Sequence, residues 1–194
     1  MKFSPTKIRS CKEWKDVLIK LGDNDLYFRR DYIRATGFPL LPKEVLKTLA
    51  VNLKGKNVID AGCGTGFLSW LLQKQGINVI PVDNNETDHW FKAEAYTDIV
   101  KKDAVSCISR EHDVVILSWP YYKGSFSLDV CEAMHPGQTM IYQGEAKGNC
   151  TGTYEFFDCL AAKFTLNLPF TQELNHNHVQ FRGFHDYWEV YEKN

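Results

Sequence analysis

No apolar run in this 194-residue sequence approaches the roughly 18 residues that a membrane-spanning helix needs. The first residues, MKFSPTKIRSCKEW, also lack the apolar centre of a signal peptide. These two absences disfavour a membrane-inserted or exported protein. We therefore expect a soluble protein of the cytoplasm that has no membrane partner.

The sequence lacks an excess of basic residues, because 23 Lys and Arg stand against 24 Asp and Glu, for a formal net charge of −1. Such a chain has no overall cationic field to attract nucleic acid. The groups that could form a local basic patch are small: Lys101 with Lys102, and Arg29 with Arg30 and Arg34. A nucleic acid partner is therefore possible but not supported by charge.

The cysteines lack CxxC spacing, which argues against a zinc site or a redox motif. Reduced thiols of an intracellular protein are expected at all six positions: Cys11, Cys63, Cys107, Cys131, Cys150 and Cys159. His176 and His178 have no Cys or acid at ligand spacing. The sequence therefore predicts no metal.

What the chain does have is enough apolar material, 44% of its residues, to bury a core. Short apolar runs predict strands over 56–62, 77–83, 97–103, 113–120, 138–145, 178–184 and 186–193, the third of them weak. Helical periodicity predicts helices over 11–21, 41–53, 67–76, 126–134 and 153–164. This alternation indicates an α/β fold with a doubly wound parallel sheet. We expect residues 1–54 to form an N-terminal helical cap within the same domain, and 55–194 the core.

The first predicted strand leads into NVIDAGCGTG (57–66), where Gly62, Gly64 and Gly66 follow an acid, Asp60. A glycine-rich turn between a buried strand and a helix lets the backbone approach a ligand closely. The dinucleotide fingerprint G-x-G-x-x-G would need glycine where Phe67 stands. No Lys-Ser/Thr follows the loop, so a phosphate-binding P-loop is excluded.

The pattern D-x-G-x-G-x-G at the end of a strand resembles the first motif of class I S-adenosylmethionine (SAM) methyltransferases. The resemblance implies a Rossmann-like seven-stranded sheet, mostly parallel with the last strand antiparallel, and SAM as cofactor with S-adenosylhomocysteine (SAH) as product. It also implies that the loop wraps the amino-acid part of SAM. The loop residues that it assigns to cofactor binding are Asp60, Ala61, Gly62, Cys63, Gly64, Thr65 and Gly66.

Two further acids agree with this resemblance. Asp83 ends the second strand, where a carboxylate can accept hydrogen bonds from both ribose hydroxyls, and Asn84 can contact the adenine edge. In the family, an acid after the third strand accepts from the adenine amine, which assigns that role to Asp103 and places Ala104 beside it. Asp98 is a rival for this position, and Asp83 can instead be a solvated turn acid.

The fourth predicted strand ends in Ser118-Trp119-Pro120-Tyr121. This resembles the [Asp/Asn/Ser]-Pro-Pro-[Tyr/Phe] motif of methyltransferases that act on exocyclic amines, with Trp in place of the first Pro. A polar side chain there accepts hydrogen bonds from the attacking amine, and an aromatic face stacks the planar substrate and favours a cationic transition state. Ser118 and Tyr121 are thus candidate catalytic residues, and Ser118 is also a candidate cofactor contact. The alternative is a packed strand end.

Three more segments resemble a narrower group of small methyltransferase-like proteins: RRDYIRATGFPLLPKEVL, IYQGEAKGNCTG and GFHDYWEVYEK. We predict that Tyr32 joins Trp119, Pro120 and Tyr121 in binding substrate, the rival being a ring in the core. Glu145, after the fifth strand, is a candidate catalytic residue that orients or deprotonates an amine or hydroxyl. The alternative for Glu145 is a pair with an arginine of the cap.

His185 and Asp186 begin the last predicted strand. They form either a strand-end hydrogen-bond pair or a general base.

These residues favour a SAM-dependent methyltransferase that modifies a nitrogen or oxygen of a small molecule or an exposed amine. A nucleic-acid base methyltransferase is the first alternative, supported by the strand-four motif alone. A SAM-binding protein without catalysis is the second.

Overall fold

The computed structural model describes residues 7–22, 25–84 and 94–194. Within these ranges, no helix is both long and apolar enough to cross a membrane. One sheet contains seven strands, namely β1 (Asn57–Ala61), β2 (Asn78–Asp83), β3 (Val100–Lys101), β4 (Val114–Ser118), β5 (Thr139–Gly144), β6 (Phe164–Leu166) and β7 (Tyr187–Lys193). The helices are α1 (Cys11–Leu21), α2 (Asp25–Thr36), α3 (Lys43–Leu53), α4 (Phe67–Gln73), α5 (Ala104–Cys107), α6 (Phe126–Ala133), α7 (Tyr154–Lys163) and α8 (Leu168–His176).

The strands lie in the order β3-β2-β1-β4-β5-β7-β6. β1 to β5 pair in parallel, and β7 runs antiparallel to both of its neighbours. This confirms the predicted Rossmann-like sheet. The strand order reverses between β1 and β4, and sheets of this kind bind ligands at the carboxyl ends of the strands beside such a reversal.

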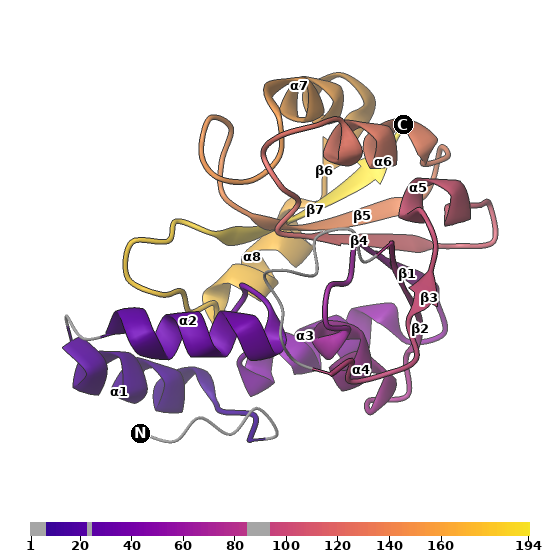
Figure 1. Cartoon of the computed structure of the whole chain (residues 1–194). Helices are drawn as coiled ribbons and strands as arrows, with labels where there is room; N and C mark the ends of the chain where they lie inside the picture. Colours follow the sequence, from indigo (N-terminus) through magenta and orange to yellow (C-terminus); the bar gives the residue numbers. More distant parts are fainter. Residues whose placement is uncertain (1–6, 23–24, 85–93) are drawn as a thin grey trace.

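Helices cover both faces of the sheet, α3, α4 and α8 on one side and α5, α6 and α7 on the other (Figure 1). Alternate residues of β4 pack into the two cores: Val114 and Ile116 into the first, Val115 and Leu117 into the second. A strand buried on both faces needs apolar residues throughout, which explains the unbroken run that made it recognisable. The same alternation puts Ser118 on the face of α3 and α4.

The N-terminal helices α1 and α2 form a separate apolar cluster with the segment that precedes β7 (Figure 1). Trp14 and Tyr32 contact each other edge to face, and Val179 and Phe181 pack into the same cluster. Ser10 and Glu13 form a reciprocal capping box at the start of α1. The cap is thus tied to the far end of the chain. The division of the domain at residue 54 stays a prediction.

Several local predictions were wrong. Residues 178–184 form no strand, because Val179 and Phe181 insert side chains into the cap cluster and Gly183 turns the chain at φ +81°. The seventh strand is instead the short β6, followed by α8, and neither was predicted. The third strand shortens to two residues.

The expectation of reduced thiols fails at two positions. Cys131 of α6 and Cys159 of α7 are joined by a disulfide, whereas Cys11, Cys63, Cys107 and Cys150 are free.

Candidate active site

The loop after β1 requires glycine for conformational and steric reasons. Gly62, Gly64 and Gly66 have φ values of +73°, +56° and +69°, in the left-handed region that disfavours side chains. A Cβ added to Gly62 would lie 3.1 Å from the ring of Phe126. The amides of Gly62 and Cys63 both donate to the carbonyl of Val82, at 2.9 and 3.1 Å, which folds the loop back onto β2.

Asp83, at the end of β2, is connected directly to this loop. The backbone N–H of Gly64 donates to Asp83 Oδ2 at 2.8 Å. A carboxylate has about four lone-pair positions, so it can accept this bond and further bonds from two hydroxyls. The structure therefore brings the predicted ribose-binding acid against the predicted loop.

Asp60, the acid at the end of β1, is buried with 2% of its surface exposed. Burial raises the pKa of Asp60 to about 6, and the nearby charge of Asp83 adds to the rise. The Ser69 hydroxyl opposes it by donating to Asp60 Oδ2 at 2.6 Å. Burial also raises the pKa of the Cys63 thiol, which stays neutral. A cation brought to this end of the loop would favour the ionised form of Asp60.

Thr65 presents an unsatisfied polar group in the same loop. Its hydroxyl is buried and has no hydrogen-bond partner among the described residues, although its carbonyl accepts from Tyr96 N at 3.0 Å. A buried hydroxyl without a partner is costly, and such groups commonly meet a ligand or water. The bare backbone, the Thr65 hydroxyl and the Asp83 carboxylate together fit the amino-acid and ribose parts of SAM.

The end of β4 lies beside β1 across the reversal in strand order. Ser118 stands opposite Gln143 of β5, and its hydroxyl donates to Gln143 Oε1 at 3.3 Å. The N–H of Trp119 donates to the carbonyl of Gln143 at 2.7 Å. Among the described residues, Trp119 alone has a positive φ, +49°, without being glycine. Such a conformation costs about 1–3 kcal/mol and is concentrated at functional sites.

The strained backbone directs the Trp119 ring into an aromatic cluster, which we call the aromatic wall: Phe38, Trp119 and Phe184. Phe38 and Trp119 stack with 4.6 Å between centroids and 13° between planes, and Phe184 lies 4.9 Å from Trp119. The guanidinium of Arg29 lies 5.0 Å from the centroid of Phe184. The Trp119 Nε1–H is buried and unpartnered within the described part of the chain.

Pro120 and Tyr121 continue from the wall to the molecular surface. The carbonyl of Pro120 accepts from Gly152 N at 3.0 Å, and Tyr121 forms an isolated β-bridge with Thr151. Tyr121 is 56% exposed, so its ring is available at the rim of the site.

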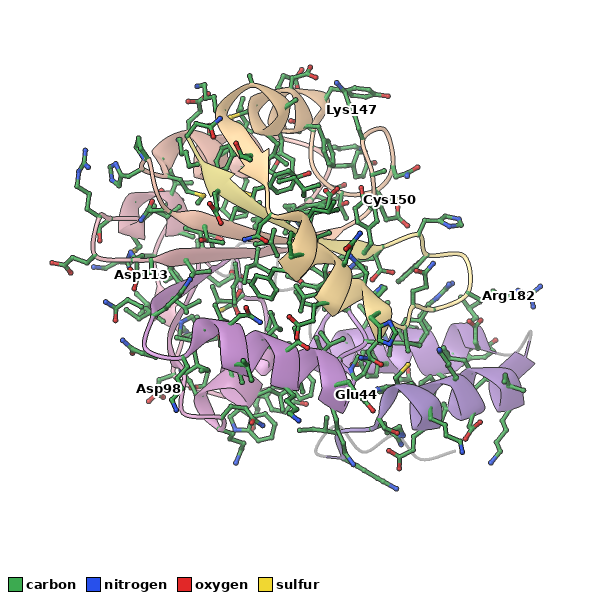
Figure 2. All side chains as sticks on the ribbon, turned by 180° about the vertical axis from the view of Figure 1, so that it is seen from behind. Glu44, Asp98, Asp113, Lys147, Cys150 and Arg182 are labelled. Atoms are coloured by element: carbon green, nitrogen blue, oxygen red, sulfur yellow. A yellow bond between two sulfur atoms is a disulfide. The ribbon has the colours of Figure 1, made fainter. Side chains whose placement is uncertain are left out.

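Glu145, just after β5, is buried and holds two loops together. Its Oε1 accepts from His185 N at 2.9 Å and its Oε2 from Cys150 N at 3.1 Å. Cys150 lies between Lys147 and Arg182 along one side of the molecule (Figure 2). Among the described residues, no ion pair joins Glu145 to an arginine of the cap. A catalytic role for Glu145 stays a prediction.

Other predicted site residues lie away from the glycine loop and the end of β4. Tyr32 is 2% exposed in the cap core, and its hydroxyl donates to the carbonyl of Pro39 at 3.1 Å. Asp103 caps α5 by accepting from the backbone of Val105 and Ser106, each at 3.2 Å, and Ala104 is buried behind it. Asn84 is exposed where β2 ends. In the described ranges, no three His, Cys, Asp or Glu side chains group as metal ligands.

No protein-family model matches the chain, and no curated protein matches it. Solved structures do match. One is the 1,6-didemethyltoxoflavin-N1-methyltransferase of Burkholderia thailandensis with bound 1,6-didemethyltoxoflavin and SAH. It is 16% identical, with a TM-score of 0.51 over 97% of this chain and 92% of that one.

A second match comes from a structure on the conversion of a disulfide bond into a thioacetal group during echinomycin biosynthesis. It is 15% identical, with a TM-score of 0.52 over 83% of this chain and 84% of that one. The fold is that of class I SAM-dependent methyltransferases. At these identities the likeness extends to the fold alone.

The methyltransferase fold also contains a cleft of about 260 Å³ at the opposite, amino-terminal edge of the sheet. Its lining includes Lys56, Phe170, Glu173 and Glu192. None of its polar side chains is a buried group without a partner. The buried, unpartnered hydroxyl of Thr65 makes the glycine loop the stronger candidate for a ligand site.

Phe38, Phe184 and Gln143 were not predicted as site residues. The two phenylalanines come from the cap and from the segment before β7, so their meeting depends on the tertiary fold. Gln143 could have been recognised from the sequence, because a polar side chain in the otherwise apolar strand MIYQG needs a buried hydrogen-bond partner.

Proposed function

We propose that this chain is a SAM-dependent methyltransferase that transfers a methyl group to a nitrogen or oxygen of a small, planar acceptor. One observation carries the proposal. The glycine loop, bound to Asp83 through Gly64 N, lies across the β1–β4 reversal from Ser118 and Trp119. The candidate cofactor loop and the polar–aromatic pair of side chains thus lie at the same, carboxyl edge of the sheet, where such folds bind ligands.

On the cofactor side, the side-chain-free backbone of the glycine loop would lie against the amino-acid part of SAM, and the unpartnered Thr65 hydroxyl would hydrogen-bond to it. Asp83 would accept from the ribose hydroxyls and Asn84 would contact the adenine edge, whereas Asp103 already accepts two backbone N–H groups of α5 and Ala104 is buried. When bound, SAM supplies an electrophilic methyl group on a sulfonium. Asp60, whose pKa burial raises to about 6, would ionise beside that positive charge.

On the acceptor side, the hydroxyl oxygen of Ser118 would accept a hydrogen bond from the attacking group and aim its lone pair at the methyl carbon. Trp119 would present a π face to the positive charge that develops on the acceptor. Pro120 and Tyr121 would line the entrance. The near-parallel rings of Phe38 and Trp119 favour a planar acceptor over a branched aliphatic one.

In this proposal Glu145 has a structural role rather than a catalytic one. Both of its carboxylate oxygens accept backbone N–H groups, so we assign it to holding the loops that carry Cys150 and His185 beside the site. The proposal also keeps residues 1–54 as a cap over the core and places the protein in the cytoplasm.

Two assays test the proposed function. Calorimetric titration with SAM and SAH should give saturable binding to one site per chain, and no binding of either at millimolar concentration would refute the cofactor assignment. Transfer of a tritiated methyl group to a panel of amines, nucleosides, RNA and DNA then tests catalysis. Methylation of polymers with none of the free nucleosides would favour the nucleic-acid alternative instead.

A further inference from the structure

A buried chain of polar side chains begins at Ser118 of β4 and continues, away from the glycine loop, to β5 and to the segment before β7. It contains Gln143 of β5, with no exposed surface, Asp186, which is 2% exposed, and His178, whose side chain is 7% exposed. Buried polar groups are costly unless each donor meets an acceptor, so their hydrogen bonds have defined directions. These directions decide what Ser118 can offer to the site.

The direction is fixed first at His178. Its Nε2 lies 2.8 Å from the carbonyl oxygen of Asp186, which can only accept, so Nε2 carries the hydrogen. The same nitrogen lies 3.3 Å from Asp186 Oδ2. An N–H that points between these two oxygens makes Asp186 Oδ2 an acceptor on this side.

The carboxylate then fixes the amide of Gln143. Asp186 Oδ2, which also faces the Nε2–H of His178, accepts from Gln143 Nε2 at 2.5 Å. The amide nitrogen of Gln143 must therefore face Asp186, which turns its oxygen toward Ser118. Because an amide oxygen only accepts, the Ser118 hydroxyl donates its single hydrogen to Gln143 Oε1 at 3.3 Å.

We propose that Gln143 and Asp186 are positioning residues that hold Ser118 as a hydrogen-bond acceptor toward the substrate. With its hydrogen directed at Gln143, Ser118 presents only lone pairs to the crevice. The methyl-accepting atom must therefore carry a hydrogen, and a flat primary or secondary amine fits best. This inference rests on the proposed function, which it deepens by naming the acceptor class.

Methyl transfer from SAM to such an amine forms one bond and breaks one. The lone pair of the acceptor nitrogen forms the new N–C bond, and the electrons of the broken C–S bond remain on the sulfur of SAH. The nitrogen gains a positive charge and releases its proton to water. The hydroxyl hydrogen of Ser118 stays on Ser118 and remains directed at Gln143 Oε1. Ser118 therefore orients the amine without acting as a base.

A double-mutant cycle separates positioning from a purely structural role. Gln143→Met removes both polar atoms at similar volume, and Ser118→Ala removes the oxygen that Gln143 is inferred to orient. Methyl transfer to adenosine, cytidine and guanosine is measured at saturating SAM. Gln143→Met should lower kcat roughly tenfold when Ser118 is present and less than about twofold when Ser118 is Ala. SAH affinity of Gln143→Met should stay within about twofold of the unmodified protein.

Equal losses of kcat in both backgrounds would overturn the inference, because Gln143 would then act independently of Ser118. A second control uses N6,N6-dimethyladenosine, which matches adenosine but carries no hydrogen on its exocyclic nitrogen. Methylation of that nitrogen as fast as the one in adenosine would also overturn it.

A measurement without turnover keeps the inference separate from the proposed function. In the full-length protein labelled with 15N, the side-chain amide protons of Gln143 should exchange with solvent at least about tenfold faster in Asp186→Leu than in the unmodified chain. Unchanged exchange would refute the hydrogen-bond direction even in a protein that binds SAH. Failure to bind SAH, with exchange altered as expected, would refute the proposed function alone.

Discussion

The glycine loop and the end of β4 face each other across one reversal in strand order, yet they are built differently. The loop uses backbone: three glycines at positive φ leave it without side chains at those positions, and their amides are bonded to Val82, Asp83 and Cys63. The end of β4 uses side chains, with Trp119 stacked on Phe38 and Ser118 bonded to Gln143. A backbone site can be encoded in ten consecutive residues, whereas a side-chain site has to be assembled from distant parts of the chain.

The largest expected effect tests the backbone side of this comparison. Gly62→Ala places a Cβ against Phe126 at a positive φ, and we expect SAM affinity to fall at least about 100-fold in calorimetry. Gly76→Ala is the matched control, because Gly76 has φ +79° but nothing within 4 Å of an added Cβ. Equal losses of affinity in both variants would show that backbone strain, and not the loop's contact with ligand, is responsible.

The next effect concerns the pH dependence of stability through Asp60. Because the folded state raises the pKa of Asp60 to about 6, the folded state binds more protons than the unfolded state between pH 4 and pH 6. The free energy of unfolding should therefore fall by about 2–3 kcal/mol as pH rises through this range. Asp60→Asn, measured by urea unfolding, should lack this fall.

The affinity for SAM should have the opposite pH dependence from the stability, because the positive charge of SAM favours the ionised form of Asp60. Affinity should increase from pH 5 to pH 7 in the unmodified protein and stay flat in Asp60→Asn. An increase of the same size in both would place the responsible group elsewhere.

A third prediction concerns the loops beside the side-chain site. In Glu145→Gln, one backbone N–H keeps its acceptor while the other faces an amide nitrogen. We expect the free energy of unfolding to fall by about 1–3 kcal/mol, measured by thermal melting. Glu111→Gln, at an exposed position, is the control and should change stability by less than about 0.5 kcal/mol. If Glu145→Gln were as stable as the control, the loops would not depend on that carboxylate.

The smallest expected effect concerns the stability of variants in the aromatic wall. Trp119→Phe keeps a ring against Phe38 and removes the unpartnered Nε1–H, so the lost area and the relieved donor nearly offset each other. The change in unfolding free energy should stay within about 1 kcal/mol. Trp188→Phe also removes an unpartnered Nε1–H, but Trp188 has no exposed surface, so the smaller ring leaves a closed cavity and the change should cost more. The reverse ranking would mean that Trp119 is a packing residue rather than part of an open wall.

The same contrast explains what could be predicted from the sequence. The β1 loop, Asp83 and the end of β4 were placed correctly because each is a local pattern at the end of a buried strand. Gln143 and Phe184 were missed because their partners depend on strand register and on the cap. Residues 178–184 alternate like a strand, but Val179 and Phe181 bury themselves in the cap cluster instead.

The most direct test of the account is a comparison of amide spectra of the full-length 15N-labelled protein with and without SAH. We predict the largest shifts at Gly62, Gly64 and Thr65, with a smaller shift at Ser118. Shifts confined to the residues around Lys56 and Phe170, at the opposite edge of the sheet, would contradict the assignment of the cofactor to the glycine loop.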